Sequence, residues 1–160
     1  MLILLMGVSG AGKTTVGTLL ASDLGWDFVD ADDYHPATNI EKMSNGIPLN
    51  DADRAPWLET LRTLIAARVA AKKNTVLACS ALQQAYRKTL QVAPDVRVVY
   101  LKGTMPLLQQ RLSERRGHYM TERMLDGQLA ALEEPENATV VAIDRPPAEI
   151  VAQIRATLAL

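Results

Sequence analysis

The stretch LILLMGVSGAGKTTVGTLL, residues 2–20, decides the fold of this chain. It opens with the apolar run Leu2–Met6, which is typical of a buried strand. The segment that follows, Gly7 to Thr14, matches the pattern G-x-x-x-x-G-K-[ST]. Apolar residues at helical spacing come after the motif. A strand, a glycine-rich turn and a helix in this order predict a P-loop.

Each part of this motif suits a chain of phosphates. Glycines let the backbone curl, so that successive N–H groups point inward at phosphate oxygens. The ammonium of Lys13 can reach the β- and γ-phosphates, and the hydroxyl of Thr14 can ligate Mg²⁺. The positive end of the following helix also favours an anion. The motif therefore predicts binding of a nucleoside triphosphate, the alternative being a glycine-rich turn that binds nothing.

Length and composition indicate one ordinary globular domain, residues 1–160. The 17 Lys and Arg face 18 Asp and Glu, and this balance argues against a dedicated nucleic-acid binder. Cys79 is the only cysteine, which excludes an intrachain disulfide and fits a reducing, cytoplasmic location. The opening MLILLM is shorter than the roughly 20 residues of a membrane helix and has no basic region before it. We therefore expect neither a membrane segment nor a secretory signal.

The P-loop does not by itself name the reaction. The D-x-x-G and N-K-x-D motifs that GTPases add are both missing from the sequence. A large motor ATPase does not fit into 160 residues. Small P-loop kinases remain as the main candidates, and a module that binds nucleotide as a signal is the non-enzyme alternative.

Short apolar runs alternate with longer segments of helical period, which is typical of an α/β domain with a mainly parallel sheet. The pattern predicts strands at Leu2–Met6, Asp27–Asp30, Thr75–Ser80, Val96–Leu101 and Thr139–Ile143. It predicts helices at Lys13–Leu24, Asp53–Lys72, Gln83–Gln91, Met105–Arg116, Glu122–Leu132 and Pro147–Leu158, with Asp53 as an N-cap. Two polar connections, 31–52 and 111–121, interrupt the pattern. Long connections of this kind serve as binding loops or lids, or else form solvated surface.

Two carboxylates follow the second predicted strand. Asp30 and Asp32 stand two residues apart, so both can project to one side if the strand continues. Phosphoryl transfer to a hydroxyl needs one carboxylate that orients the nucleophile and accepts its proton. It also needs an acidic group that holds Mg²⁺ directly or through water. The pair suits these two tasks, and a solvated acidic turn is the alternative.

The polar connection beyond the carboxylates carries hydrogen-bond donors and cations. His35, Lys42 and Arg54 together suit an acceptor that is polyhydroxylated and anionic, because arginine grips carboxylates through two hydrogen bonds. Taken singly, His35 and Arg54 are as readily explained as structural or surface residues. Arg87 on the helix after the third strand faces either the ligand or solvent. Cys79 is interpreted as a small buried residue rather than a nucleophile.

Arginines gather again in the second connection. Arg111, Arg115 and Arg116 lie within a few residues of His118. A segment that closes over ATP must neutralise the charge that spreads over the transferred phosphoryl group, and the arginine guanidinium suits this task. Arg111 stands one helical turn before Arg115, which would let it stack on the adenine while the later pair reaches phosphate. The alternative is a basic helix end that complements its own dipole.

The sequence resembles the gluconate kinase family along essentially its whole length. The most specific string is DADDYHPATNIEKMSNGIPLNDADRAPWL at residues 30–58. Further matching strings are MGVSGAGKTT at 6–15, CSALQQAYR at 79–87, VVYLKG at 98–103 and RLSERRGHYM at 111–120. The chain is more distantly similar to shikimate kinase, whose D-x-D motif and basic lid occupy similar places.

The resemblance implies an α/β fold of the P-loop NTPase type, a three-layer sandwich with a five-stranded parallel sheet of order 2-3-1-4-5. It implies ATP-dependent phosphorylation of D-gluconate to 6-phospho-D-gluconate with Mg²⁺. It implies a substrate-binding segment at about 31–58 and a lid at about 111–121. Several members of the family are homodimers.

Carried over residue by residue, the resemblance assigns roles to the candidate residues. It implies phosphate binding by Gly7, Ser9, Gly10, Ala11, Gly12, Lys13, Thr14 and Thr15. It implies a Mg²⁺ site at Thr14 and, through water, Asp30, with Asp32 as the base. Contacts to gluconate are implied for Asp32, His35, Lys42, Arg54 and Arg87. Arg111 becomes the adenine residue and Arg115 or Arg116 the lid arginine.

The chain departs from the family pattern at two places. Family members often read DGD where this chain has Asp30-Ala31-Asp32, and LHP where it has Tyr34-His35-Pro36. The first change keeps both acids, and the second bears on selectivity among sugar acids. Another small-molecule kinase of the shikimate kinase type is the nearest alternative. A nucleotide-sensing module would be expected to lose Lys13, Asp32 or the lid arginines, and all of them are present.

Overall fold

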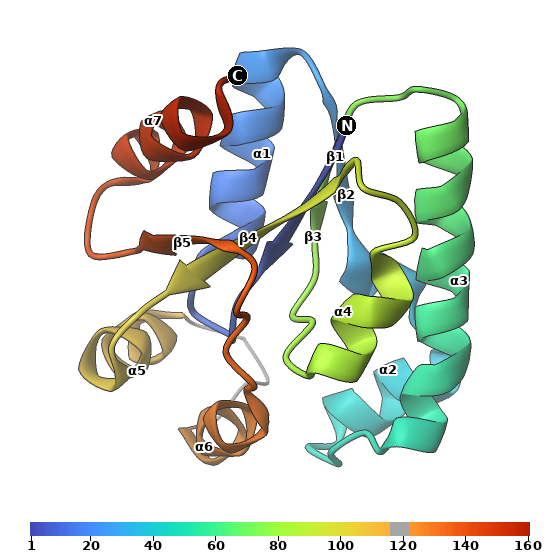
Figure 1. The fold of residues 1–160 in the computed structure, drawn as a ribbon. Coiled ribbons are helices and arrows are strands. Elements are labelled where there is room, and N and C mark those ends of the chain that lie inside the picture. Colours follow the sequence, from blue (N-terminus) through green and yellow to red (C-terminus); the bar gives the residue numbers. More distant parts are fainter. Residues whose placement is uncertain (116–121) are drawn as a thin grey trace.

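The apolar runs of the sequence form one parallel sheet. The computed structural model describes residues 1–115 and 122–160. Its strands are β1 (Leu2–Met6), β2 (Asp27–Asp30), β3 (Thr75–Ala78), β4 (Val96–Lys102) and β5 (Thr139–Ala142). They lie in the order β2-β3-β1-β4-β5, which confirms the predicted order, and every pairing is parallel (Figure 1). The P-loop strand β1 is therefore central, and its carboxyl end opens between its neighbours.

Helices cover both faces of this sheet. They are α1 (Lys13–Leu24), α2 (Ala37–Ser44), α3 (Asp51–Ala70), α4 (Gln84–Leu90), α5 (Met105–Glu114), α6 (Glu122–Ala131) and α7 (Pro147–Leu158), with the short 3₁₀ helix η1 (Ala31–Tyr34). Helices α1 and α7 pack on one face, and α3 and α4 pack on the other (Figure 1). Helices α2, α5 and α6 lie toward the carboxyl edge of the sheet. Among the described residues, no helix has both the length and the hydrophobicity needed to cross a bilayer.

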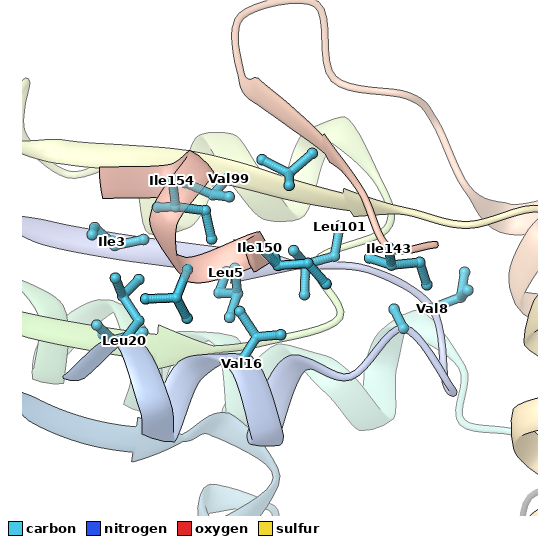
Figure 2. Packing of buried hydrophobic residues seen from close by; sticks show 14 of the residues in the cluster. Ile3, Leu5, Val8, Val16, Leu20, Val99, Leu101, Ile143, Ile150 and Ile154 are labelled. Atoms are coloured by element: carbon cyan, nitrogen blue, oxygen red, sulfur yellow. The ribbon is translucent and has the colours of Figure 1, made fainter. Parts of the chain in front are cut away.

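The central position of β1 in the sheet explains why its sequence is apolar without alternation. Ile3 and Leu5 point into the cluster under α1 and α7, whereas Leu4 and Met6 point into the cluster under α3 and α4. All of β1 is buried, because both faces of a parallel sheet are covered by helices. Figure 2 shows the first cluster, in which β1 and β4 side chains meet those of the two helices, including Val16, Leu20, Ile150 and Ile154. This packing fixes the carboxyl end of β1, and with it the P-loop.

The polar connection 31–52 is more ordered than its sequence predicts. It contains η1 and α2, and α3 begins at Asp51 rather than at Asp53. The N-cap is Asn50, whose Oδ1 accepts from the Asp53 backbone N–H at 2.8 Å, while the Asp53 carboxylate accepts from the Asn50 N–H at 3.0 Å. The prediction of Asp53 as N-cap is thus wrong, because Asp53 is the third residue of a capping box. Helix α2 was missed because its buried residue is the polar Asn39.

Candidate active site

A cavity of about 770 Å³ opens at the carboxyl edge of the sheet. The P-loop and the ends of β2 and β3 form its floor, and α3, α4 and α6 contribute walls. Ligands of open α/β sheets bind at this edge, because the loops that follow the strands converge there. The cavity gathers the predicted site residues Ser9, Gly10, Gly12, Lys13, Thr14, Asp30, Asp32, His35, Arg54 and Arg115.

The P-loop presents a cation and glycine-dependent turns to the cavity. Gly10 and Gly12 have φ values of 84° and 87°, in the left-handed region that favours glycine. The Lys13 ammonium donates to the carbonyls of Gly7 at 2.9 Å and Val8 at 3.1 Å. Burial lowers the pKa of Lys13, and the negative charges of Asp32 and Asp30 oppose this shift. The two hydrogen bonds to the loop carbonyls hold the Lys13 ammonium against the loop.

Not every member of the predicted phosphate-binding run reaches the cavity. Gly7, Ala11 and Thr15 are not among its lining residues. Gly7 serves through its carbonyl, which accepts from Lys13. Ala11 is fully buried beneath the turn, and Thr15 points to solvent. The structure therefore places the anion-facing part of the loop at Ser9, Gly10 and Gly12 to Thr14.

Two oxygen-bearing side chains meet beside the P-loop. The Thr14 hydroxyl donates to the Asp30 carboxylate at 3.1 Å. The other carboxylate oxygen accepts from the Asp32 backbone N–H at 3.0 Å. Hydroxyl and carboxylate oxygens are ligands that Mg²⁺ prefers, and Mg²⁺ is usually held by one or two such groups together with substrate phosphates. Within the described residues, no cluster of three or more His, Cys, Asp or Glu could hold a metal ion.

Asp32 reaches the cavity by a turn and not by strand alternation. Strand β2 ends at Asp30, whose side chain caps η1, and Asp32 lies in the first turn of that helix. The expectation that both acids project from a continuing strand is therefore wrong, because the cap bends the chain. The Asp32 side chain is 69% exposed, and its Oδ1 lies 4.0 Å from His35 Nε2. Asp32 thus presents its carboxylate to the cavity and to solvent.

His35 is fixed by packing. Its side chain is 5% exposed and stacks on Trp57, with ring centroids 4.3 Å apart and planes at 12°. The Trp57 indole N–H donates to the Ala31 carbonyl at 2.7 Å, which ties the stack to η1. Burial, helped by the positive charge of Arg54, lowers the pKa of His35 to about 4. The imidazole is consequently neutral at physiological pH.

This pKa gives a testable dependence of stability on pH. The unfolded chain protonates His35 near 6.5 and the folded chain only near about 4, so the unfolded state holds more protons in between. The free energy of unfolding should therefore rise with pH across this interval, by about 3 kcal/mol from this residue. Urea unfolding at a series of pH values measures the slope. His35→Gln should flatten it, and equal slopes in both proteins would contradict the neutral imidazole.

Arg54 belongs to a small polar cluster at the mouth of the cavity. Its Nη1 donates to the Tyr86 hydroxyl at 3.2 Å and lies 3.8 Å from Asp51 Oδ1. The Tyr86 hydroxyl donates to the same Asp51 oxygen at 2.5 Å. Burial, followed by the hydrogen bond to Asp51, raises the pKa of Tyr86. The cluster holds the guanidinium of Arg54 on the cavity wall with capacity for a further acceptor.

The structure does not bring Lys42 or Arg87 to the cavity wall. The Lys42 ammonium lies 2.9 and 3.0 Å from the two Asp53 carboxylate oxygens. Arg87 is buried and donates to the carbonyls of Ala81, Leu82 and Glu133 at 2.8, 2.9 and 2.7 Å. These hydrogen bonds are made within the protein, so a contact of Lys42 or Arg87 with the substrate stays a prediction.

The basic connection is only partly described. Arg111 lies at the end of α5 and donates to the carbonyls of Ile143 at 2.6 Å and Gly10 at 3.4 Å, so it braces the outer side of the P-loop. Arg115 is exposed, lines the cavity, and its positive charge adds to the lowering of the Lys13 pKa. Arg116 and His118 lie outside the described residues.

Three residues that line the cavity were not predicted from the sequence, namely Tyr86, Trp57 and Gln128. Tyr86 precedes the arginine that was singled out, and one residue turns a helix by about 100°, so the two face different ways. Trp57 lies in a helix that was predicted from its leucines, and no role was predicted for it. Helix α6 contributes Gln128, whose Oε1 accepts from the Ser9 N–H at 2.8 Å and whose Nε2 donates to the Ser9 hydroxyl at 3.2 Å. Nothing in the sequence near residue 128 signals this contact.

Cys79 lines the cavity as a buried thiol. Burial raises its pKa to about 12. A thiol that stays protonated is a poor nucleophile. The interpretation of Cys79 as a small packing residue therefore stands, and the residue leaves room at the end of β3.

Comparisons with known proteins agree with this geometry. A family model described as an AAA domain matches residues 2–135. A probable gluconokinase of Xenopus tropicalis is 44% identical over 96% of this chain and 91% of that protein. The thermoresistant gluconokinase of Escherichia coli K12 is 42% identical, covering 92% of this chain and 87% of that protein.

Solved structures extend the comparison to the fold. The crystal structure of a gluconokinase from Sinorhizobium meliloti 1021 superposes with a TM-score of 0.86 at 42% identity, covering 98% of this chain and 90% of that one. Shikimate kinase from Aquifex aeolicus vf5 has a TM-score of 0.62 at 20% identity, covering 99% and 96% of the two chains. The second likeness concerns the fold alone.

Proposed function

Since this chain belongs to the gluconokinase family, we propose that its cavity transfers the γ-phosphoryl group of ATP to the primary hydroxyl of D-gluconate, forming 6-phospho-D-gluconate. One observation carries the proposal: a single cavity joins the P-loop, the Asp32 carboxylate and the Arg54 guanidinium. The three groups match the three parts of the reaction, which are the phosphate donor, the hydroxyl to be deprotonated and the carboxylate of the acceptor.

The donor end of the cavity would bind ATP through the P-loop. Backbone N–H groups of Gly10, Gly12, Lys13 and Thr14 would surround the phosphates, and Lys13 would leave its loop carbonyls for the β- and γ-phosphate oxygens. Thr14 and Asp30 would hold Mg²⁺, Asp30 through water, as their mutual hydrogen bond already places them together. The ion supplies charge neutralisation on the phosphates.

The acceptor end would position the hydroxyl of gluconate against Asp32. The hydroxyl oxygen attacks the γ-phosphorus, the bond from that phosphorus to the β,γ-bridging oxygen breaks, and ADP departs. Asp32 accepts the hydroxyl proton, which the exposure of its carboxylate to the cavity allows. Arg54, held by Tyr86, would pair with the carboxylate of gluconate.

Arginines would complete the site on the nucleotide side. Arg115 is placed to neutralise charge on the transferred phosphoryl group, because it lines the cavity close enough to influence Lys13. We assign the same task to Arg116 as an alternative, and adenine contact to Arg111. We also propose a cytoplasmic location, and a homodimer like those of several members of the family that the sequence resembles. Light scattering would measure the oligomeric state.

The substrate proposal is tested by a coupled assay of ADP release. The protein and Mg-ATP are mixed with D-gluconate, other aldonates, glucose, shikimate or nucleoside monophosphates. Turnover with gluconate well above the other acceptors is the expected result. Turnover with another acceptor alone would keep a kinase but contradict the substrate. ATP binding without turnover of any acceptor would favour a nucleotide-sensing module.

The role of Arg54 makes a separate prediction. Arg54→Ala should raise KM for gluconate by about 10- to 100-fold, since a hydrogen-bonded charge pair contributes roughly 1.5–3 kcal/mol. KM for ATP should not change, because Arg54 lies at the acceptor end. Steady-state kinetics with each substrate varied measures both values. Arg62→Ala is the matched control, because Arg62 lies on the same helix and pairs with Glu59 in an exposed bridge. An equal rise in both KM values would contradict the assignment.

A further inference from the structure

Asn39 is a buried amide whose orientation is fixed by its partners. It is 2% exposed, and its Nδ2 lies 2.9 Å from the Asp53 carbonyl oxygen. A backbone carbonyl only accepts hydrogen bonds, so the atom facing it must be the amide nitrogen. The same nitrogen lies 3.3 Å from His35 Nδ1. The amide therefore offers its second N–H to the imidazole.

This contact determines where the imidazole carries its proton. A nitrogen that accepts from an amide N–H has no hydrogen of its own, so Nδ1 of His35 is the acceptor and the neutral ring holds its proton on Nε2. The positive charge of Arg54 on α3 also disfavours an imidazolium. Asp32 on η1 brings a negative charge to the ring, and its Oδ1 lies 4.0 Å from Nε2.

The segment that carries Asn39 is itself held firmly. Asp53 takes part in the capping box with Asn50 and in the bridge with Lys42. The Asn50 N–H, followed by Lys42, lowers the pKa of the Asp53 carboxyl, so the bridge persists in mildly acidic solution. This gives Lys42 a function that does not involve substrate. Lys42 holds the first turn of α3 in place through Asp53, and the Asp53 carbonyl orients Asn39.

We propose that His35 is a positioning residue that directs its Nε2–H at the Asp32 carboxylate and so holds that carboxylate for proton acceptance. The ring is held in this orientation because Trp57 stacks on it. The Trp57 indole N–H in turn donates to the carbonyl of Ala31 in η1, the 3₁₀ helix that also carries Asp32. The present separation of 4.0 Å is longer than a hydrogen bond, and catalytic contacts commonly shorten when substrate binds. The kinetic part of this inference rests on the proposed function, whereas the tautomer does not.

The consequence for substrate recognition is specific. A neutral imidazole that donates to Asp32 does not supply a cation for the carboxylate of gluconate. That task then falls to Arg54, the one of the three predicted cations Lys42, Arg54 and Arg87 that lines the cavity. His35 should accordingly affect kcat, and Arg54 should affect KM for gluconate.

The tautomer is measured first, on the wild-type protein without substrate. A long-range ¹H–¹⁵N correlation spectrum separates the Nε2–H tautomer, the Nδ1–H tautomer and the imidazolium. The chain has only two histidines, so the spectrum of His35→Gln assigns the signals. We expect the Nε2–H form at pH 7. An Nδ1–H form or an imidazolium would overturn the proposal, whether or not the protein turns over gluconate.

Kinetics of two variants then test the positioning role. His35→Phe keeps a ring against Trp57 but has no N–H, and we expect kcat to fall by about 10- to 100-fold with KM for ATP unchanged. His35→Gln keeps an N–H donor and should recover part of the loss. Wild-type kcat in His35→Phe would overturn the proposal, as would equal losses in both variants. Absence of gluconate turnover in the wild-type protein would instead contradict the proposed function. The tautomer would still be decided by the correlation spectrum.

Discussion

Asp32→Asn should lower kcat for gluconate phosphorylation by about 100- to 10,000-fold, the range that general base catalysis supplies. Asparagine has nearly the shape of aspartate but cannot accept the hydroxyl proton. The Asp32 side chain lines the cavity between the P-loop and Arg54, so its loss removes the base without emptying the site. ATP binding, measured by calorimetry, should survive, because the P-loop contacts are untouched.

The adjacent carboxylate provides a matched control for this experiment. Asp33 is exposed in the same 3₁₀ helix and is not a lining residue of the cavity. Asp33→Asn makes the same change of charge one position away and should leave kcat within about twofold, since exposed substitutions of this kind cost little. If both variants lose activity equally, the effect is one of local charge. Wild-type turnover in Asp32→Asn would remove Asp32 as the base.

Lys13→Ala should lower kcat/KM for ATP by about 100- to 1,000-fold, the cost of removing one preorganised donor to developing charge. The Lys13 ammonium donates to the Gly7 and Val8 carbonyls of the loop, and it would exchange these contacts for phosphate oxygens when ATP binds. The lysine sits beside two acids, Asp30 and Asp32, and its removal also leaves their charges unbalanced. Both effects weaken the binding of a polyanion.

Two further variants separate position from charge. Lys13→Arg keeps the cation but replaces a compact ammonium by a wide planar group, so it should recover little activity. Lys88→Ala removes an exposed lysine of α4 and should change nothing. Thermal unfolding of each variant shows whether the fold is intact. Full activity in Lys13→Ala with an intact fold would contradict a catalytic P-loop.

Much of the fold was predictable from local sequence pattern. The bounds of β1, β2, α1 and α7 agree with the prediction at both ends. The apolar residues of these segments pack in the core, and their burial leaves a hydrophobic pattern that is visible in one chain. The predicted helix from Asp53 was displaced by two residues because Asn and Asp both cap well, and only the extended backbone of Asn50 decides between them.

The candidate site was predictable where a motif carries it. Lys13, Thr14, Asp30 and Asp32 come together as expected, since the P-loop and the end of the neighbouring strand meet at one edge of the sheet. The places of Arg87 and Tyr86 in the structure were not predictable from the sequence. Pattern alone could not place Arg87, whose partner at Glu133 lies 46 residues away. Sequence pattern also gave no reason to choose Tyr86 as a site residue. In the structure, its position on α4 brings its hydroxyl to Arg54.

Local sequence was enough to predict the P-loop, the parallel sheet and the acids at its edge, because each of these follows from local backbone preference or from burial. The partners of the polar side chains became known from the folded structure. Asn39 orients His35, Gln128 binds Ser9, and Lys42 holds Asp53. A hydrogen bond depends on the position of two atoms to within a fraction of an ångström. Chain segments far apart in sequence reach that precision only after the core has packed.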